Sequence, residues 1–514
     1  MAALPVPSPA DLAGGRRFLL EIDRRLERLD RAILISDFNQ QAGRSSRGPE
    51  RWQLARSALL SDPALLPWVR SARERRWPAR LARELELLER IALEARVEES
   101  PEVVRLRNEL ARRVVRFRPL WKGRRVDRVI PRRALREDPD PEVRRRGYYA
   151  EEELHRSLEA PLRTLIELRN ERAREAGFRD LSEMRLGFSG IRPDEFDGLC
   201  EEVLRTAPGA LRALRDRRDR SEADHGWHPW DVAYARERLA RPPDALFPKG
   251  RMLPRILQAV ARWGFRTGSM HFRVVFHDLP AGGLTLAPDP PRDVRILVHP
   301  VGGWSAYHVM FHEVGHAVQS SLVRVPGHLT LWHENVPGFG GYHEGIGALF
   351  EEIPRDGAWL AGMGVERPLA SEFARVRREG ELGDAVSTVL WAQTEMELYR
   401  HPGKDPVPAL ERRRRQLYGF DEYAPPSFAD SFWVDLPIYS PNYLFAKLFH
   451  HQLAETIRST LGEPLWPNRR VGPWLTRHWF RDGSLFDWKP RIREVSGSPF
   501  GAGAFQRAMR DLGA

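Results

Sequence analysis

The segment 311–317, FHEVGHA, constrains this chain more than any other part of its sequence because it contains the HExxH motif. On a helix, His312 and His316 stand one turn apart on the same face, where both imidazoles can reach one metal ion. Glu313 lies about one residue's rotation away, where it can take a proton from a zinc-bound water. The pattern therefore predicts a helix with a zinc site on one face. Gly315 lowers helix propensity by roughly 1 kcal/mol, which predicts that another part of the chain approaches closely there.

A catalytic zinc site needs a third protein ligand and an open position. HExxH alone also arises by chance, so the hypothesis needs this third ligand. The segment 342–347, YHEGIG, offers Glu344, with His343 beside it as a competing ligand. Glu344 could instead stabilise the N-terminus of a helix expected over 346–352.

The composition indicates a globular, water-soluble protein, since 42% of the 514 residues are hydrophobic and 30% are charged. This length predicts two lobes or several packed layers. No stretch approaches the roughly 20 unbroken apolar residues of a membrane helix, and residues 1–30 do not resemble a signal peptide. Cys200 is the only cysteine, which excludes an internal disulfide and a thiolate-rich metal site. We expect a buried packing role for Cys200 and a cytoplasmic location.

The formal net charge of +11 is spread along the whole chain and carried almost entirely by arginine. Such a balance can indicate binding to nucleic acid or to a membrane surface. However, basic blocks such as 144–146 and 412–415 lie in helical-looking stretches that also carry acidic residues. This arrangement predicts solvated helix faces with exposed ion pairs. We therefore expect neither nucleic acid nor a membrane as a partner.

The hydrophobic patterns predict a mainly α protein with a small antiparallel β-sheet next to the HExxH helix. The first two hundred residues look helical, most clearly 140–177, where Pro161 should kink or split the helix. Short strand-like runs follow at 272–276, 282–287 and 294–298. After the HExxH segment the pattern is helical again.

Four motifs, taken in order, resemble the zinc peptidase superfamily of thimet oligopeptidase, oligoendopeptidase F and angiotensin-converting enzyme. They are WDVAY at 230–234, HEVGH at 312–316, NVPGF at 335–339 and HEGIG at 343–347. The resemblance runs from about residue 140 to 453, and it implies two helical lobes that flank a deep substrate channel with one zinc ion on its floor. We expect residues 1–190 to be an N-terminal helical region contributing to the channel lid, and 191–514 to be the catalytic region.

The resemblance also assigns roles to individual side chains. It implies that His312, His316 and Glu344 are the zinc ligands and that Glu313 is the general base. In the family, this base deprotonates the attacking water and then passes the proton to the leaving amine.

Further residues of the site come from two other segments. The segment 437–445 resembles the one that carries the family's late tyrosine, so Tyr443 aligns with the residue that stabilises the oxyanion. Tyr439 lies one turn earlier and could touch substrate, although both tyrosines could simply pack in the core. Relatives pair an edge strand with the substrate backbone. The corresponding substrate-binding residues here are Gly283, Leu284 and Thr285.

The sequence departs from the converting-enzyme branch at two places. That branch has an acidic residue four positions after the third ligand, where this chain has Ala348. Glu351 or Glu352 could supply the carboxylate to a ligand histidine instead. The branch also fixes the C-terminal carboxylate of its substrate with Lys and His, and the segment 431–434 has neither. Release of dipeptides from C-termini is therefore not expected.

Three functions are consistent with these patterns. The leading hypothesis is hydrolysis of peptide bonds in oligopeptides, with peptides as the partners. A zinc carboxypeptidase that trims C-terminal residues is the first alternative. The second is a basic protein that binds nucleic acid or an acidic partner around a structural metal. A structural site would have four protein ligands and no base, which Glu313 and the expected open position argue against. The oligomeric state is not predicted.

Overall fold

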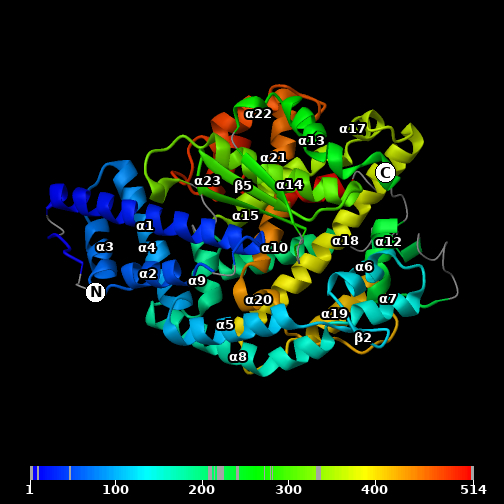
Figure 1. Ribbon diagram of the computed structural model, residues 1–514, viewed down its shortest axis with the longest axis horizontal. Helices are drawn as coiled ribbons and strands as arrows, with labels where there is room; N and C mark the ends of the chain where they lie inside the picture. Colours follow the sequence, from blue (N-terminus) through cyan, green and yellow to red (C-terminus); the bar gives the residue numbers. More distant parts are fainter. Residues whose placement is uncertain are drawn as a thin grey trace.

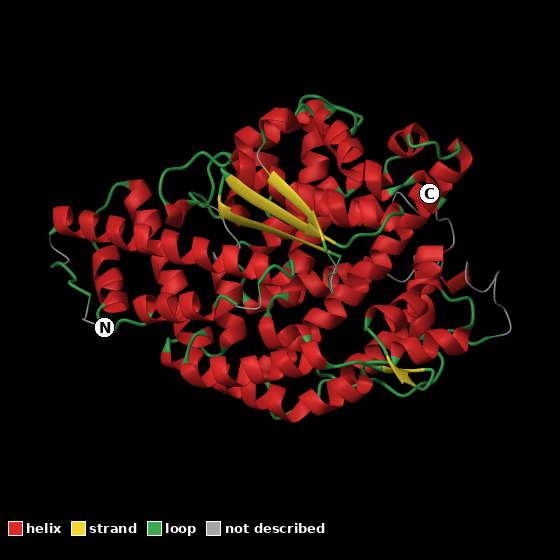
Figure 2. Cartoon of the chain, viewed as in Figure 1, coloured by secondary structure: helices red, strands yellow, loops and turns green. Residues whose placement is uncertain are grey.

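The computed structural model describes residues 4–510 except 9–10, 46–47, 207–210, 213–214, 217–224, 239–241, 271, 278, 280–281 and 332–336. Helices make up most of this part of the chain, and the strands form one three-stranded sheet and a two-stranded ribbon (Figure 2). The predicted fold class, mainly α with a small sheet, is confirmed. Among the described residues, none of the helices combines the length and apolar character that crossing a membrane requires.

The first four N-terminal helices lie together at one end of the molecule, and the fifth runs along its lower edge (Figure 1, blue to cyan). They are α1 (Leu12–Gln41), α2 (Glu50–Leu60), α3 (Leu65–Arg73), α4 (Ala79–Glu98) and α5 (Pro101–Arg116). Asp11 caps α1, because its carboxylate accepts a hydrogen bond from the Gly14 N–H. The far end of α1 packs on the three-stranded sheet through Leu34 and Phe38. This helix therefore connects the N-terminal region to the sheet beside the HExxH helix.

The next part of the chain contains the β1–β2 ribbon and a further set of helices. The elements are β1 (Leu120–Trp121), β2 (Arg124–Arg125), α6 (Val129–Glu137), α7 (Pro141–Tyr148), α8 (Glu152–Glu175), α9 (Leu181–Phe188), α10 (Pro193–Thr206) and α12 (Pro229–Arg238). One helix over 140–177, kinked or split at Pro161, was predicted, and the prediction of a single helix was wrong. The chain breaks between α7 and α8 instead, and Pro161 lies inside α8. Proline removes one hydrogen bond there, while Leu158 and Leu162 on either side are completely buried and hold the helix in place.

The three-stranded sheet has the order β3–β5–β4. Its strands, β3 (Phe272–Phe276), β4 (Gly283–Asp289) and β5 (Asp293–Val298), coincide closely with the three predicted runs. The β4–β5 pair is antiparallel, as expected, but β3 runs parallel to β5, so the sheet is mixed. The reason is that β4 and β5 form a hairpin and β3 pairs with the far side of β5. As a result, β4 is an edge of the sheet in the described part of the chain.

The helices around the sheet come next in the chain. They are η1 (Asp244–Leu246), η2 (Lys249–Arg251), α13 (Met252–Ala261), η3 (Thr267–Ser269), α14 (Trp304–Leu322), η4 (His328–Thr330), α15 (Gly340–Phe350), α16 (Glu352–Arg355) and α17 (Gly357–Gly362). Helices α14 and α15 cross in close contact. A Cβ at Gly315 would lie 3.1 Å from Cγ of Phe350, and one at Gly347 would lie 2.5 Å from Cε1 of His312. The close approach predicted at Gly315 is thus confirmed, and α15 is the element that makes it.

The C-terminal part adds the longest helix and the helix that completes the site. Its elements are α18 (Arg367–Arg400), α19 (Val407–Tyr418), α20 (Phe432–Asp435), α21 (Ser440–Leu461), α22 (Val471–Leu475), η5 (Thr476–Phe480), α23 (Trp488–Ser496) and α24 (Gly503–Arg510). Helix α21 packs closely on α15, since a Cβ at Gly345 would lie 2.5 Å from Cδ1 of Phe449. The three helices α14, α15 and α21 therefore form one compact unit.

One large hydrophobic cluster extends from Leu4 to Met509 and includes side chains from both sides of residue 190. The division into regions 1–190 and 191–514 stays a prediction. Cys200 is buried, as expected. Arg144 corrects the expectation of solvated basic faces, because it is completely buried and pairs with Asp231 at 2.7 Å. A buried carboxylate from the WDVAY segment satisfies its charge, which the local sequence does not reveal.

Candidate active site

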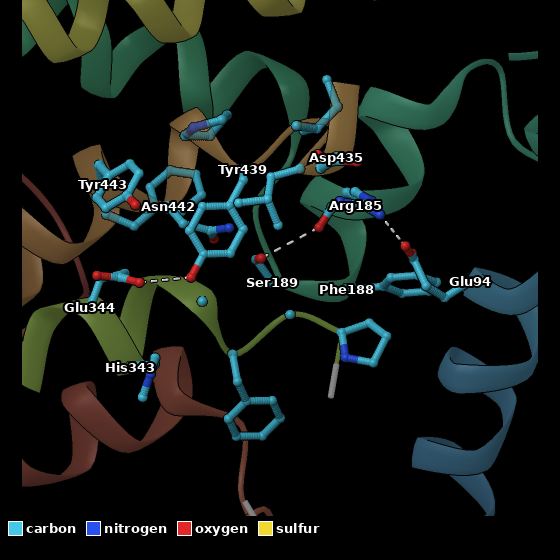
Figure 3. Close-up of a pocket in the computed structure, with 18 of the residues that line it drawn as sticks. Glu94, Arg185, Phe188, Ser189, His343, Glu344, Asp435, Tyr439, Asn442 and Tyr443 are labelled. Atoms are coloured by element: carbon cyan, nitrogen blue, oxygen red, sulfur yellow. Dashed lines mark hydrogen bonds and ion pairs between the residues drawn. The ribbon is translucent and has the colours of Figure 1, made fainter. Parts of the chain in front are cut away.

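One cavity of about 660 Å³ brings together segments that are far apart in the sequence. Residues of β4, α14, α15 and α21 line it, together with residues of α4 and α9 from the N-terminal region. Figure 3 shows the part of the cavity around Glu344 and Arg185. All the residues that the sequence assigned to the site line this cavity: Gly283, Leu284, Thr285, His312, Glu313, His316, Glu344, Tyr439 and Tyr443.

Three of these side chains converge as a metal-ligand set. One ligand atom each from His312, His316 and Glu344 lie within 4.8 Å of one another, and Nε2 of His312 is 3.2 Å from Oε2 of Glu344. The histidines are one turn apart in α14, as HExxH predicts. Glu344 lies inside α15, which begins at Gly340 rather than at the expected residue 346. This earlier start places its carboxylate on the helix face that meets α14.

Glu351 orients the first histidine. Its Oε1 accepts a hydrogen bond from Nδ1 of His312 at 2.9 Å, which leaves Nε2 facing Glu344. Arg355 donates to the other oxygen of Glu351 at 2.7 Å, and His308 lies 3.2 Å from that oxygen. Burial lowers the pKa of His312, but hydrogen bonds to Glu344 and Glu351 outweigh it and raise this pKa well above its usual value. Of the two carboxylates considered from the sequence, Glu351 is therefore the one that contacts a histidine of the set.

Glu313 is positioned beside these ligands by strand β4. The hydroxyl of Thr285 donates a hydrogen bond to Oε2 of Glu313 at 2.7 Å, which orients the carboxylate. A Cβ at Gly283 would lie 2.6 Å from Cγ of Glu313, so only glycine leaves room for this rotamer. Burial raises the pKa of Glu313 to about 7. A carboxylate with this pKa can both accept and return a proton near neutral pH.

His343 lies outside the ligand set. Its ring stacks on that of His316, with 3.6 Å between centroids and 22° between planes. Its Nδ1 lies 3.4 Å from Oε1 of Gln319. Burial lowers the pKa of both imidazoles well below the usual value, which keeps them neutral. His343 therefore packs against a candidate ligand, while Glu344 offers the third candidate ligand atom.

The two tyrosines occupy adjacent positions at the start of α21 (Figure 3). The hydroxyl of Tyr439 donates to Oε1 of Glu344 at 2.7 Å, so this tyrosine holds the third candidate ligand. The ring of Tyr443 stacks on Trp391 with 6.0 Å between centroids. Burial and the nearby charges of Glu344 and Glu313 raise the pKa of Tyr443. Its hydroxyl thus remains protonated and can donate a hydrogen bond into the cavity.

Buried ionic side chains hold the turn that leads into α21. Arg169 donates to the backbone carbonyls of Trp433 and Val434, and Arg185 donates to that of Pro437. Glu395 accepts hydrogen bonds from the N–H groups of Ile438 and Ser440 and from the Ser440 hydroxyl.

The same turn stores backbone strain next to the site. Ile438 has φ of 50°, an uncommon conformation for a β-branched residue. The hydrogen bonds to this turn stabilise the strained backbone conformation. Glu395, Arg169 and Arg185 were not found from the sequence, because their partners lie far away in the chain and no motif marks them.

The donor set fits a zinc ion. Neutral imidazole nitrogens and a carboxylate oxygen are its usual ligands at catalytic sites with three protein ligands. The glutamate on Nδ1 of His312 is the partner that ligand histidines commonly have. The motif segment 335–339 is only partly covered, since Asn335 and Val336 lie outside the described residues.

The comparisons with known proteins concern the fold. No protein-family model matches the chain, and no curated protein matches its sequence. Among solved structures, Trypanosoma cruzi metallocarboxypeptidase 1 is similar, with a TM-score of 0.68 and 16% identity over 96% of this chain and 99% of that one. PZ peptidase A with an inhibitor has a TM-score of 0.73 and 15% identity, over 97% of this chain and 92% of that one. A putative oligoendopeptidase F has a TM-score of 0.71 and 16% sequence identity, over 98% of this chain and 92% of that one.

The chain therefore has the helical fold of these peptidases over nearly its whole length. The resemblance to the oligoendopeptidase F superfamily, derived from the motifs, is confirmed at the level of the fold. At these identities the likeness does not extend to the reaction, which has to be argued from the site itself.

Proposed function

We propose that the protein is a zinc-dependent peptidase that hydrolyses peptide bonds in oligopeptides. The observation that carries this proposal is the convergence of His312, His316 and Glu344, with the buried carboxylate of Glu313 beside them. A binding protein with a structural metal would have no use for such a base. The fold of solved peptidases, shared over nearly the whole chain, supports the same conclusion.

The residues of the site divide the reaction between them. Zinc, held by His312, His316 and Glu344, would supply Lewis-acid polarisation of the scissile carbonyl and of a water molecule. Glu313 takes a proton from the attacking water and then passes it to the nitrogen of the leaving amine. Tyr443 donates its O–H to the negative charge that develops on the carbonyl oxygen.

The edge strand β4 gives the substrate a backbone to pair with. A peptide lying along Gly283, Leu284 and Thr285 could form main-chain hydrogen bonds while its side chains vary. We propose that the N-terminal region, which contributes Glu94 and Arg185 to the cavity wall, acts as a lid over the bound peptide. This arrangement favours oligopeptides over folded proteins.

A carboxypeptidase is the second candidate because three of the similar structures, the Trypanosoma cruzi protein among them, are called carboxypeptidases. Such an enzyme needs a cation for the terminal carboxylate of its substrate. The described lining residues include the guanidinium groups of Arg56 and Arg185, and each is already paired with a glutamate, Glu99 and Glu94 respectively. This pairing makes cleavage of internal bonds the preferred mode.

Digestion of a peptide library, with products identified by mass spectrometry, tests the proposal. Cleavage should occur at internal bonds, stop when a chelator removes the metal, and return when zinc is added. Loss of single C-terminal residues would establish the carboxypeptidase instead. If no peptide is cleaved by the zinc-loaded protein, the proposed function is wrong.

The single cysteine remains the basis for proposing a cytoplasmic location.

A further inference from the structure

A second cluster of potential ligands lies outside the cavity. We propose that Glu381, His450 and His451 form a structural zinc site, with Glu352 beside it, that is distinct from the HExxH site. None of the four lines the cavity. The proposal concerns metal binding alone and does not depend on the proposed peptidase function.

The distances from the two histidines to the nearest carboxylate oxygens approach those between neighbouring ligands of a zinc ion. Bonds of about 2.0–2.1 Å in a tetrahedron put neighbouring ligand atoms about 3.3 Å apart. Nε2 of His451 lies 3.1 Å from Oε1 of Glu381, and Nε2 of His450 lies 3.3 Å from Oε1 of Glu352. Nε2 of His450 is 4.0 Å from Oε1 of Glu381. The same spacing, 3.2 Å between Nε2 of His312 and Oε2 of Glu344, characterises the HExxH site.

Burial makes this cluster costly without a cation. The side chains of Glu381, His450 and His451 are 6%, 2% and 10% exposed, so water solvates them little. A buried carboxylate beside two buried imidazoles is a set of donors that a divalent cation would stabilise.

Arg458 and Arg355 are the cations beside the cluster, and Arg355 contacts Glu381. It lies 3.6 Å from Oε2 of Glu381, on the side away from the oxygen that faces the histidines. It also lies 3.4 Å from Oε1 of Glu352, the oxygen that faces His450, and 2.7 Å from Glu351. Arg458 lies 3.8 Å from Oε2 of Glu352. The two arginines therefore hold Glu352, which leaves Glu381 as the carboxylate ligand, with Arg355 orienting it.

The three ligands and Glu352 come from three helices that frame the active site. Glu352 begins α16, directly after Glu351, which contacts His312. Glu381 lies in α18, and both histidines lie in α21, the helix that carries Tyr443. The three ligands are buried and lie outside the lining of the cavity, so an ion there would be away from a bound substrate. We therefore assign it a structural role, which is to clamp these helices together behind the active site.

Zinc content of the purified full-length protein, measured by elemental analysis after zinc loading and dialysis, tests the proposal. The wild type should hold two zinc ions per chain, and His316→Ala, which loses a ligand of the other site, should hold one. His451→Gln should also hold one, because glutamine keeps a hydrogen bond to Glu381 but is a poor zinc ligand. His401→Gln is the matched control, since His401 is exposed on the surface, and it should hold two.

The wild-type count does not depend on the folding of any variant. A single zinc ion per wild-type chain overturns the proposal even if the protein cleaves peptides. So does a second zinc ion that remains bound in His451→Gln while circular dichroism shows a folded protein. By contrast, two zinc ions without any peptide cleavage would leave this site in place and refute the proposed peptidase function.

Discussion

The substitution Gly283→Ala should inactivate the enzyme through its general base while leaving the metal in place. The added Cβ would lie 2.6 Å from Cγ and 2.8 Å from Oε1 of Glu313, whereas ordinary contacts begin at 3.4 Å. Glu313 must therefore retreat by about 1 Å, and a displacement of this size can lower a rate by about 10²-fold. Gly283 has no left-handed φ, so alanine fits the strand itself.

The assay for this prediction is the cleavage of a quenched peptide, combined with zinc analysis. We expect kcat/KM to fall by about 10²-fold, with zinc content and melting temperature unchanged. Gly268→Ala is the control, because nothing lies within 4 Å of a Cβ there, and it should retain full activity. Wild-type kcat/KM in Gly283→Ala would refute the idea that strand β4 fixes the position of the base.

Three further predictions concern the other parts of the site. Tyr443→Phe keeps the stacking on Trp391 but removes the hydroxyl, so turnover should fall by about 10²-fold with KM little changed; unchanged turnover would mean that Tyr443 only packs. Glu351→Gln should weaken zinc binding at the site that supports activity by about 10- to 100-fold, as measured by competition with a chelator, and an unchanged affinity would exclude its orienting role. Burial raises the pKa of Glu395 from 4.5 to about 7, so the folded protein keeps a proton that the unfolded chain releases, and stability falls as pH rises between these values. In urea unfolding, the free energy of unfolding of the wild type should fall on the order of 3 kcal/mol more over that interval than that of Glu395→Gln. Parallel pH profiles of the two proteins would contradict this prediction.

Local patterns were sufficient for the elements that carry the site. The HExxH spacing predicts the face of α14, and the β-branched and aromatic runs predict all three strands. The edge position of β4 and the parallel pairing of β3 depend on how the hairpin docks, which is a property of the assembled sheet. The break before α8 likewise reflects packing, because the local signal at Pro161 favours another position.

Contacts between distant residues could not be predicted in the same way. Glu351 and Glu352 are adjacent, and only the crossing of α14 and α15 decides that Glu351 reaches His312. Arg185 and Glu395 hold the turn before α21 across more than forty residues of sequence, without any motif. Buried charges of this kind are recognised only when their partners are known.

The most direct test of the account is the substitution Glu313→Gln, followed by measurement of both zinc content and peptide cleavage. Glutamine has the size of glutamate and leaves His312, His316 and Glu344 untouched, so the variant should hold as much zinc as the wild type. It should lose nearly all cleavage of a quenched peptide, because the amide cannot take a proton from water. Cleavage at the wild-type rate would contradict the assignment of Glu313 as the base and, with it, the proposed mechanism.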